Sequence, residues 1–109
     1  MKNKEIIVFS TCPDPECGRA IAKSLVENRA AACVNVLPGI VSIYQWEGTT
    51  QEDSECLLMI KSTADRMDTL ASQIEDLHPY ELPEVVAVPV SGGLPGYLEW
   101  VRQSVTDGS

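Results

Sequence analysis

Residues 30–48 read Ala-Ala-Ala-Cys-Val-Asn-Val-Leu-Pro-Gly-Ile-Val-Ser-Ile-Tyr-Gln-Trp-Glu-Gly. This stretch has no charge before Glu47 and is rich in β-branched and aromatic residues, so it predicts one long strand, interrupted once at Pro38-Gly39. From Ala32 to Trp46 the extended strand would span roughly 50 Å at about 3.3 Å per residue, whereas a compact domain of this size has a radius of gyration near ~13 Å. The overhanging part therefore needs cover: either the strand folds back at Pro38-Gly39 or a neighbouring chain pairs with it.

Further strands and helices alternate on both sides of that stretch. Period-two alternation, turn residues and helical spacing of apolar residues indicate where each element lies. We expect strands at Glu5–Thr11, Ala32–Trp46, Ser54–Lys61 and Glu84–Val90. We expect helices that begin at Pro15, after Ser62 or Thr63, and near Pro95, the first closing at Asn28-Arg29 and the second at His78-Pro79. The polar segment Glu47–Asp53 is predicted to form a hairpin tip.

Individual residues support this division. Asp14 is a natural N-cap, and Pro15 suits the first helical position. Pro89 inside the last strand favours a place at a sheet edge or a strand end. Cys56–Ile60 is apolar at every position, which implies that both faces of the sheet are covered there. Helices should supply one cover, and a second layer or another protomer should supply the other.

The order of the elements predicts the fold class. Strand, helix, strand, strand, helix, strand is the split pattern of the ferredoxin-like fold, a four-stranded antiparallel sheet with two helices on one face. We therefore expect an α+β protein: a ferredoxin-like βαββαβ sandwich with a C-terminal helix. Residues 1–109 are enough for one hydrophobic core but not for a second unit, so they should form a single domain.

Charge and hydropathy exclude several classes of partner. A formal net charge of −8 disfavours nucleic acid and anionic membranes, because the basic residues are dispersed and form no patch. The apolar run Ile6–Phe9 near the start is too short for a signal-peptide core or a membrane span. We expect a cytoplasmic protein without nucleic-acid or membrane partners.

The four cysteines lack the spacing of a zinc knuckle. Cys33 and Cys56 lie in predicted strands and should be buried as small apolar residues. Cys12 and Cys17 flank a helix N-terminus, where the helix dipole favours a thiolate, but Asp14 and a neighbouring glutamate oppose it. Redox chemistry at this place is the less favoured interpretation.

Four segments together resemble one known family. Tyr44–Gly48, Ile60–Thr63, His78–Glu84 and Tyr97–Trp100 look like the CutA divalent-cation-tolerance family and come in that family's order along nearly the whole chain. The resemblance implies a ferredoxin-like protomer and a homotrimer whose long hairpins, formed by the strand to Trp46 and its return, pair between neighbours. Strand length and two-sided burial had already pointed to an external partner.

The resemblance also implies copper binding, by a cysteine that ends the first strand and by two adjacent histidines before Pro-Tyr. Ser10 stands at the cysteine position and Leu77 replaces the first histidine, so only His78 matches. Cys12 lies two residues beyond Ser10 and on the same face of an extended strand, which makes it the substitute candidate. His78 can instead end its helix and form hydrogen bonds at a subunit junction. No cofactor is required, and copper or another divalent cation is the candidate metal.

A second interpretation is a ligand cleft. The family shares the trimeric ferredoxin-like architecture of PII-type signalling proteins, which bind small anions between subunits. Lys61 and Arg66 could supply positive charge to such an anion. The candidate cleft residues are Lys61, Tyr44, Trp46, Tyr80, Glu84 and Trp100. Aromatic residues that only pack an interface remain the alternative.

The sequence does not predict an enzyme. His78 is the sole histidine, and nucleophilic catalysis needs such a base within reach. The favoured function is that of a homotrimer connected with divalent metal-ion tolerance through weak metal binding. The alternative is a PII-like trimeric sensor or scaffold that binds a small anion or a partner protein.

Overall fold

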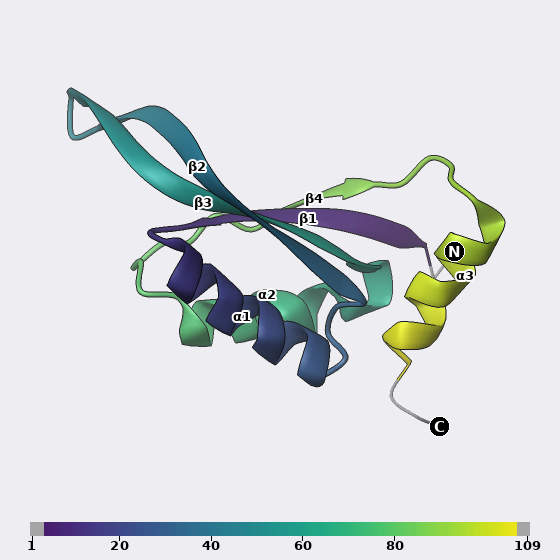
Figure 1. The fold of residues 1–109 in the computed structure, drawn as a ribbon. Coiled ribbons are helices and arrows are strands. Elements are labelled where there is room, and N and C mark those ends of the chain that lie inside the picture. The colour runs from purple at the N-terminus through teal and green to yellow at the C-terminus, as the bar shows by residue number, and fades with distance from the viewer. Residues whose placement is uncertain (1–3, 107–109) are drawn as a thin grey trace.

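A computed structural model describes residues 4–106 (Figure 1). The chain forms strands and helices in the predicted order, with one additional 3₁₀ turn. The strands are β1 (Glu5–Cys12), β2 (Cys33–Trp46), β3 (Thr49–Thr63) and β4 (Val86–Pro89). The helices are α1 (Pro15–Glu27), the 3₁₀ turn η1 (Ala64–Arg66), α2 (Met67–Leu77) and α3 (Pro95–Ser104).

The four strands form one antiparallel sheet in the order β2-β3-β1-β4. Helices α1 and α2 lie together on one face of this sheet (Figure 1). This confirms the predicted α+β fold with its four-stranded antiparallel sheet. Strand β4 pairs only with β1 and ends at Pro89, so the proline occupies an edge position, as expected.

Asp14 caps α1 as predicted. Its carboxylate accepts a hydrogen bond from the Cys17 amide at 2.8 Å, and Pro15 is the first helical residue. Strand β1 alternates half-buried and buried residues from Glu5 to Cys12, which is the pattern of a strand with one covered face. The cap fixes the point where the chain leaves β1 and turns onto the sheet.

Pro38-Gly39 bends β2 and does not reverse it. Leu37 pairs with Leu57 and Ile40 pairs with Glu55, so β2 carries one more residue than β3 across this interval. The extra residue makes a β-bulge, and Gly39 has the positive φ of 80° that such a bulge requires. Of the two predicted solutions, folding back at this point is therefore wrong.

The hairpin tip is much shorter than the predicted segment 47–53. The turn contains only Glu47 and Gly48, both with positive φ (51° and 81°), as in a two-residue hairpin loop. Strand β3 starts at Thr49 and not at Ser54. The polar composition of residues 49–53 is typical of a loop, but they lie on a solvated part of the hairpin, where a strand needs no apolar alternation.

The second helix also starts later than expected. Strand β3 continues to Thr63, and η1 separates it from α2. Ser62 does not cap a helix, because its hydroxyl is buried and donates to the Ala30 carbonyl at 2.6 Å. Thr63 precedes η1 and donates to Asp65. These hydroxyl groups fix the end of the strand, and the helix begins one turn beyond it.

The core lies between the sheet and the pair α1 and α2. We call the sheet face toward these helices the covered face. Its side chains pack with those of the two helices, and all are fully buried or nearly so: Val8, Cys12, Cys56, Leu58 and Ile60 from the sheet with Ile21, Leu25, Leu70 and Ile74 from the helices. Each large aliphatic side chain contributes about 1.5–3 kcal/mol by leaving water.

The opposite face, which we call the open face, is left partly bare by residues 4–106. Phe9, Leu57 and Met59 are half-buried, and Val86 and Val88 are 52% and 39% exposed. Cover was predicted on both sides of 56–60. The helices provide the first cover, and the second is incomplete in the single chain.

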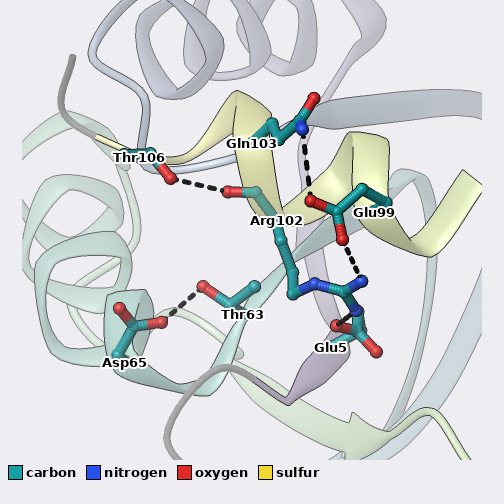
Figure 2. A network of polar contacts seen from close by, with 7 residues as sticks. All are labelled: Glu5, Thr63, Asp65, Glu99, Arg102, Gln103 and Thr106. Carbon is teal, nitrogen blue, oxygen red and sulfur yellow. Dashed lines mark hydrogen bonds and ion pairs between the residues drawn. The ribbon is translucent and has the colours of Figure 1, made fainter. Parts of the chain in front are cut away.

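Helix α3 occupies the end of the open face near the start of β1. Val101 and Val105 are buried and form a small cluster with Ala32. Arg102 reaches from α3 to Glu5, with a guanidinium nitrogen 2.6 Å from the carboxylate, and it also contacts Glu99 (Figure 2). These contacts hold α3 against the sheet.

The distal half of the β2–β3 hairpin, which we call the arm (residues 40–55), projects beyond the helical layers (Figure 1). The chain measures 47 × 26 × 22 Å, so it is about twice as long as it is wide. Val41 and Ile43 on the arm are 59% and 67% exposed. Within residues 4–106, no helix combines the length and the apolar composition needed to cross a membrane.

Candidate functional site

A cleft of about 830 Å³ opens between the arm and the segment that follows α2. Strands β2 and β3 supply one wall, and residues 80–84 supply the other. We call this the arm cleft. It exists because the bulge at Gly39 bends the hairpin and because His78-Pro79 ends α2 and sends the chain back toward the arm.

Three of the predicted aromatic residues line the arm cleft: Tyr44, Trp46 and Tyr80. The Tyr80 hydroxyl donates to Glu55 Oε2 at 2.7 Å, and burial, with the Glu55 carboxylate adding to it, raises the pKa of Tyr80. The Tyr44 hydroxyl donates to Asp53, and that hydrogen bond raises the pKa of Tyr44. Both tyrosines therefore stay protonated at neutral pH and orient a carboxylate at the cleft wall.

The charge of the arm cleft is negative. Within residues 4–106, four carboxylates line it, and its lining includes no lysine, arginine or histidine. The carboxylates belong to Asp53, Glu55, Glu81 and Glu84. Side chains of one sign in a concave surface attract the opposite sign, so the cleft favours a cation.

Asp53 and Glu55 were not among the predicted cleft residues. They are two positions apart on β3, which places them on one face of the strand. Asp53 falls in the polar segment 47–53 that was predicted to be the hairpin tip, so its strand spacing from Glu55 was not expected. Glu84 was predicted, and its carboxylate accepts a 3.5 Å hydrogen bond from the Thr11 hydroxyl at the cleft wall.

Both ring nitrogens of His78 are engaged by the main chain. Nε2 donates to the Thr11 carbonyl at 2.6 Å, and Nδ1 accepts from the Tyr80 amide at 3.1 Å. The ring is buried and lies 4.6 Å from the Tyr80 ring, centroid to centroid. A metal ion at His78 would have to displace one of these hydrogen bonds. The geometry is that of a residue that ties the end of α2 to the end of β1.

Cys12, the other predicted metal ligand, is fully buried in the core. Burial raises the pKa of its thiol to about 12, with the neighbouring Cys56 adding to the shift. The side chain points to the covered face, whereas the arm cleft is lined by other residues. Among residues 4–106, no group of three or more histidine, cysteine or acidic side chains is arranged to hold a metal ion.

Lys61 and Trp100 do not line the arm cleft. Lys61 lies beside a second cavity of about 170 Å³ under α3, where its ammonium is 5.8 Å from the centre of the Tyr97 ring. The Trp100 ring packs at a tilt of 38° against the Tyr97 ring, with ring centroids 5.5 Å apart. Arg66 donates to the Arg29 carbonyl. The predicted cleft residues therefore divide between two places in a single chain, and the basic ones are not with the aromatic ones of the arm.

Comparison with known proteins gives consistent matches. The family model described as CutA1 divalent ion tolerance protein matches residues 6–104. The divalent-cation tolerance protein CutA of Thermus thermophilus is 47% identical over 100 residues, which cover 92% of this chain and 97% of that protein. Human protein CutA is 48% identical over 102 residues, covering 91% of this chain. This chain spans 57% of the length of the human protein.

Solved structures agree with the sequence matches. The crystal structure of CutA1 from Oryza sativa has a TM-score of 0.94 at 41% identity and covers 98% of both chains. The structure of the divalent cation tolerance protein from Thermus thermophilus has a TM-score of 0.90 and covers 92% of this chain. From its sequence and its fold, the chain belongs to the CutA1 divalent ion tolerance protein family.

Proposed function

We propose that this protein is a non-catalytic, cytoplasmic homotrimer that contributes to divalent-cation tolerance by weak binding of divalent cations in the arm cleft. One observation carries the proposal: of the residues that the structure describes, four carboxylates and no basic side chain line that cleft. Their summed field raises the local concentration of divalent cations. The relatives named above carry divalent-cation tolerance in their names, which supports this choice of ligand.

Weak binding follows from the arrangement of the carboxylates. The described residues contain no three-ligand group, so an ion would keep most of its water shell. Oxygen ligands suit hard divalent ions better than they suit Cu⁺, and the oxygen-rich cleft therefore favours Mg²⁺- or Mn²⁺-like ions. Copper binding through His78 is the weaker form of the proposal, because its ring nitrogens are already engaged.

The homotrimer is supported by exposed apolar surface and by an unused strand edge. Val41, Ile43 and Trp46 are each more than half exposed on the arm. Strand β2 lies at the edge of the sheet, so one side of its backbone has no partner strand within residues 4–106. Long apolar edge strands are usually covered in stable proteins, and a second and third copy of this chain would cover this one.

The ion-binding part is tested with Mn²⁺, followed by its electron paramagnetic resonance signal during titration. The double variant Glu81→Gln, Glu84→Gln should bind Mn²⁺ about tenfold more weakly, because two carboxylates leave the cleft. The double variant Glu75→Gln, Asp76→Asn on the exposed surface of α2 removes two carboxylates outside the cleft and serves as the control with the same change of net charge. Equal weakening in both proteins would mean that only net charge matters and would overturn the assignment to the cleft.

The anion-sensor alternative has less support. Lys61 is the only basic residue in the described part of the chain that lines the second cavity, whose other lining residues are mostly apolar. A small anion usually needs several donors or a glycine-rich loop. Binding of inorganic phosphate that is lost in Lys61→Gln and survives a metal chelator would favour this alternative over the cation proposal.

A further inference from the structure

The arm cleft carries apolar surface as well as carboxylates. The rings of Tyr44, Trp46 and Tyr80 line it together with the side chain of Leu82. A hydrated divalent ion is held by oxygen atoms and makes no use of such surface. At about 830 Å³ the cleft is also far larger than an ion, and it lies in the size range of small-molecule sites, about 300–1,000 Å³. Its rings and its volume therefore point to a second, organic class of ligand.

Two tyrosine–carboxylate pairs lie in this cleft. The Tyr80 hydroxyl donates to Glu55 Oε2 at 2.7 Å, and the Tyr44 hydroxyl donates to Asp53. Each hydrogen bond holds an aromatic ring close to a negative charge. An ammonium group is attracted both by a carboxylate and by the face of an aromatic ring. Each pair therefore offers both attractions to one ammonium group.

The β3 strand sets the spacing between the two pairs. Asp53 and Glu55 are two positions apart on β3, so their side chains share one face and are roughly 6–7 Å apart at about 3.3 Å per residue. Ser42 of β2 is directly opposite Asp53, which places Tyr44 diagonally across from it on the same face. Four carbon atoms between two nitrogen atoms span roughly 6 Å, because each bond of about 1.5 Å advances by less than its length.

The carboxylates of the arm cleft do not gather around one point. Within residues 4–106, no group of three or more histidine, cysteine or acidic side chains is arranged to hold a single ion. The four negative charges of the cleft wall are instead spread over β3 and residues 81–84. Separated negative charges are matched best by a cation whose own charges are separated. Charge complementarity thus favours an extended dication.

We propose that the arm cleft binds linear aliphatic diamines in their dicationic form. Each ammonium group lies against one tyrosine–carboxylate pair, and the methylene spacer covers the apolar surface between the pairs. The inference rests on the proposed function because it uses the same acidic cleft, and it adds a class of ligand that divalent-ion binding does not require. Diamines and divalent ions compete for the same carboxylates.

The first test is a calorimetric titration of the unaltered full-length protein with three probes at neutral pH and low ionic strength. We expect 1,4-diaminobutane to bind about fivefold more tightly than butylamine, which has the same carbon chain but only one ammonium group. The shorter 1,3-diaminopropane should also bind more weakly than 1,4-diaminobutane, because it does not reach both pairs. If either of these two probes bound as tightly as 1,4-diaminobutane, the proposal would be overturned.

Variants at Tyr44, an exposed position on the arm, test the contribution of the ring. Tyr44→Leu removes the ring and should weaken the binding of 1,4-diaminobutane about two- to fivefold. Tyr44→Phe keeps the ring and should retain most of the affinity. Sedimentation velocity checks that both variants keep the assembly state of the unaltered protein. No loss in Tyr44→Leu, or an equal loss in the two variants, would contradict the proposal.

Charge variants and Mn²⁺ separate this inference from the proposed function. Asp53→Asn, Glu55→Gln should weaken 1,4-diaminobutane binding about tenfold, and the control Glu75→Gln, Asp76→Asn, with the same change of net charge, should not. Equal weakening in both double variants would overturn the inference. Binding of Mn²⁺ without binding of the diamine would refute only this inference, whereas binding of the diamine without Mn²⁺ would refute only the divalent-ion proposal.

Discussion

The two faces of the sheet are built from the same strands but differ in what lies across them. On the covered face Val8, Leu58 and Ile60 are completely buried under α1 and α2. On the open face their neighbours Phe9, Leu57 and Met59 are equally apolar and only half-buried. Composition does not separate the faces, because apolar residues alternate with apolar residues along β3. One chain satisfies one face only, which is the physical ground for expecting further copies on the other.

The largest effect should come from truncation on the covered face. Leu58→Ala removes a fully buried side chain and should lower the free energy of unfolding by about 2–5 kcal/mol, because a cavity remains. Met59 is the next residue and lies on the open face. Met59→Ala should lower the free energy of unfolding by less than about half of that amount. Urea denaturation of both variants at several protein concentrations measures the difference. If both variants lost the same free energy of unfolding, and the loss in Met59→Ala grew with protein concentration, assembly would bury the open face as deeply as the helices bury the covered face.

A charge on the arm should change the assembly more than the fold. Ile43→Asp places a carboxylate on a side chain that is 67% exposed in the chain, and burial of that charge in the proposed trimer interface should yield monomers or aggregates. Gln45→Asp adds the same charge two residues further along the strand, at an exposed polar position, and should be tolerated. Sedimentation velocity reports the mass of each. A soluble trimer of Ile43→Asp would place the interface elsewhere.

Two buried serines on the covered face should respond with opposite signs. The Ser10 hydroxyl is fully buried and has no hydrogen-bond partner among the described residues, so Ser10→Ala should raise the free energy of unfolding by about 1 kcal/mol. Ser62 donates to the Ala30 carbonyl, and Ser62→Ala should lower the free energy of unfolding by about 0.5–1.5 kcal/mol. Chemical denaturation measures both. Destabilisation by Ser10→Ala would reveal a partner for that hydroxyl.

The smallest effect concerns α3 at the end of the open face. The hydrogen bond and charge of Arg102 hold the pKa of Glu99 below its ordinary value of 4.5. A carboxylate whose pKa is lowered in the folded state stabilises the fold at any pH above its ordinary pKa. This contribution is lost as the pH falls through the lowered pKa. In Glu99→Gln the melting temperature should therefore fall slightly less on acidification than in the unaltered protein. The difference should be small because the Glu99–Arg102 pair is exposed. An unchanged pH profile would mean that, of the two carboxylates that contact Arg102, only Glu5 contributes to stability.

Much of this architecture was readable from local chemistry. The alternation in β1, the Asp14 cap and the breaks at Pro38-Gly39 and His78-Pro79 act over a few residues, so they predicted the elements and the ferredoxin-like order. The hairpin turn was misplaced, because a solvated arm has the polar composition of a loop. The chain also carried its family resemblance in four short segments, and the comparisons confirmed it.

Other features depend on segments that are distant along the chain. The register of β1 and β3 brings Cys12 to Cys56, and the approach of α1 places Gly18 beside both. The carboxylates of the arm cleft come from β3 and from the segment after α2. Composition and spacing set which elements form, because those are local preferences. Only the packing of the sheet decided which side chains meet, because a one-residue change of register would turn each strand's side chains to the other face.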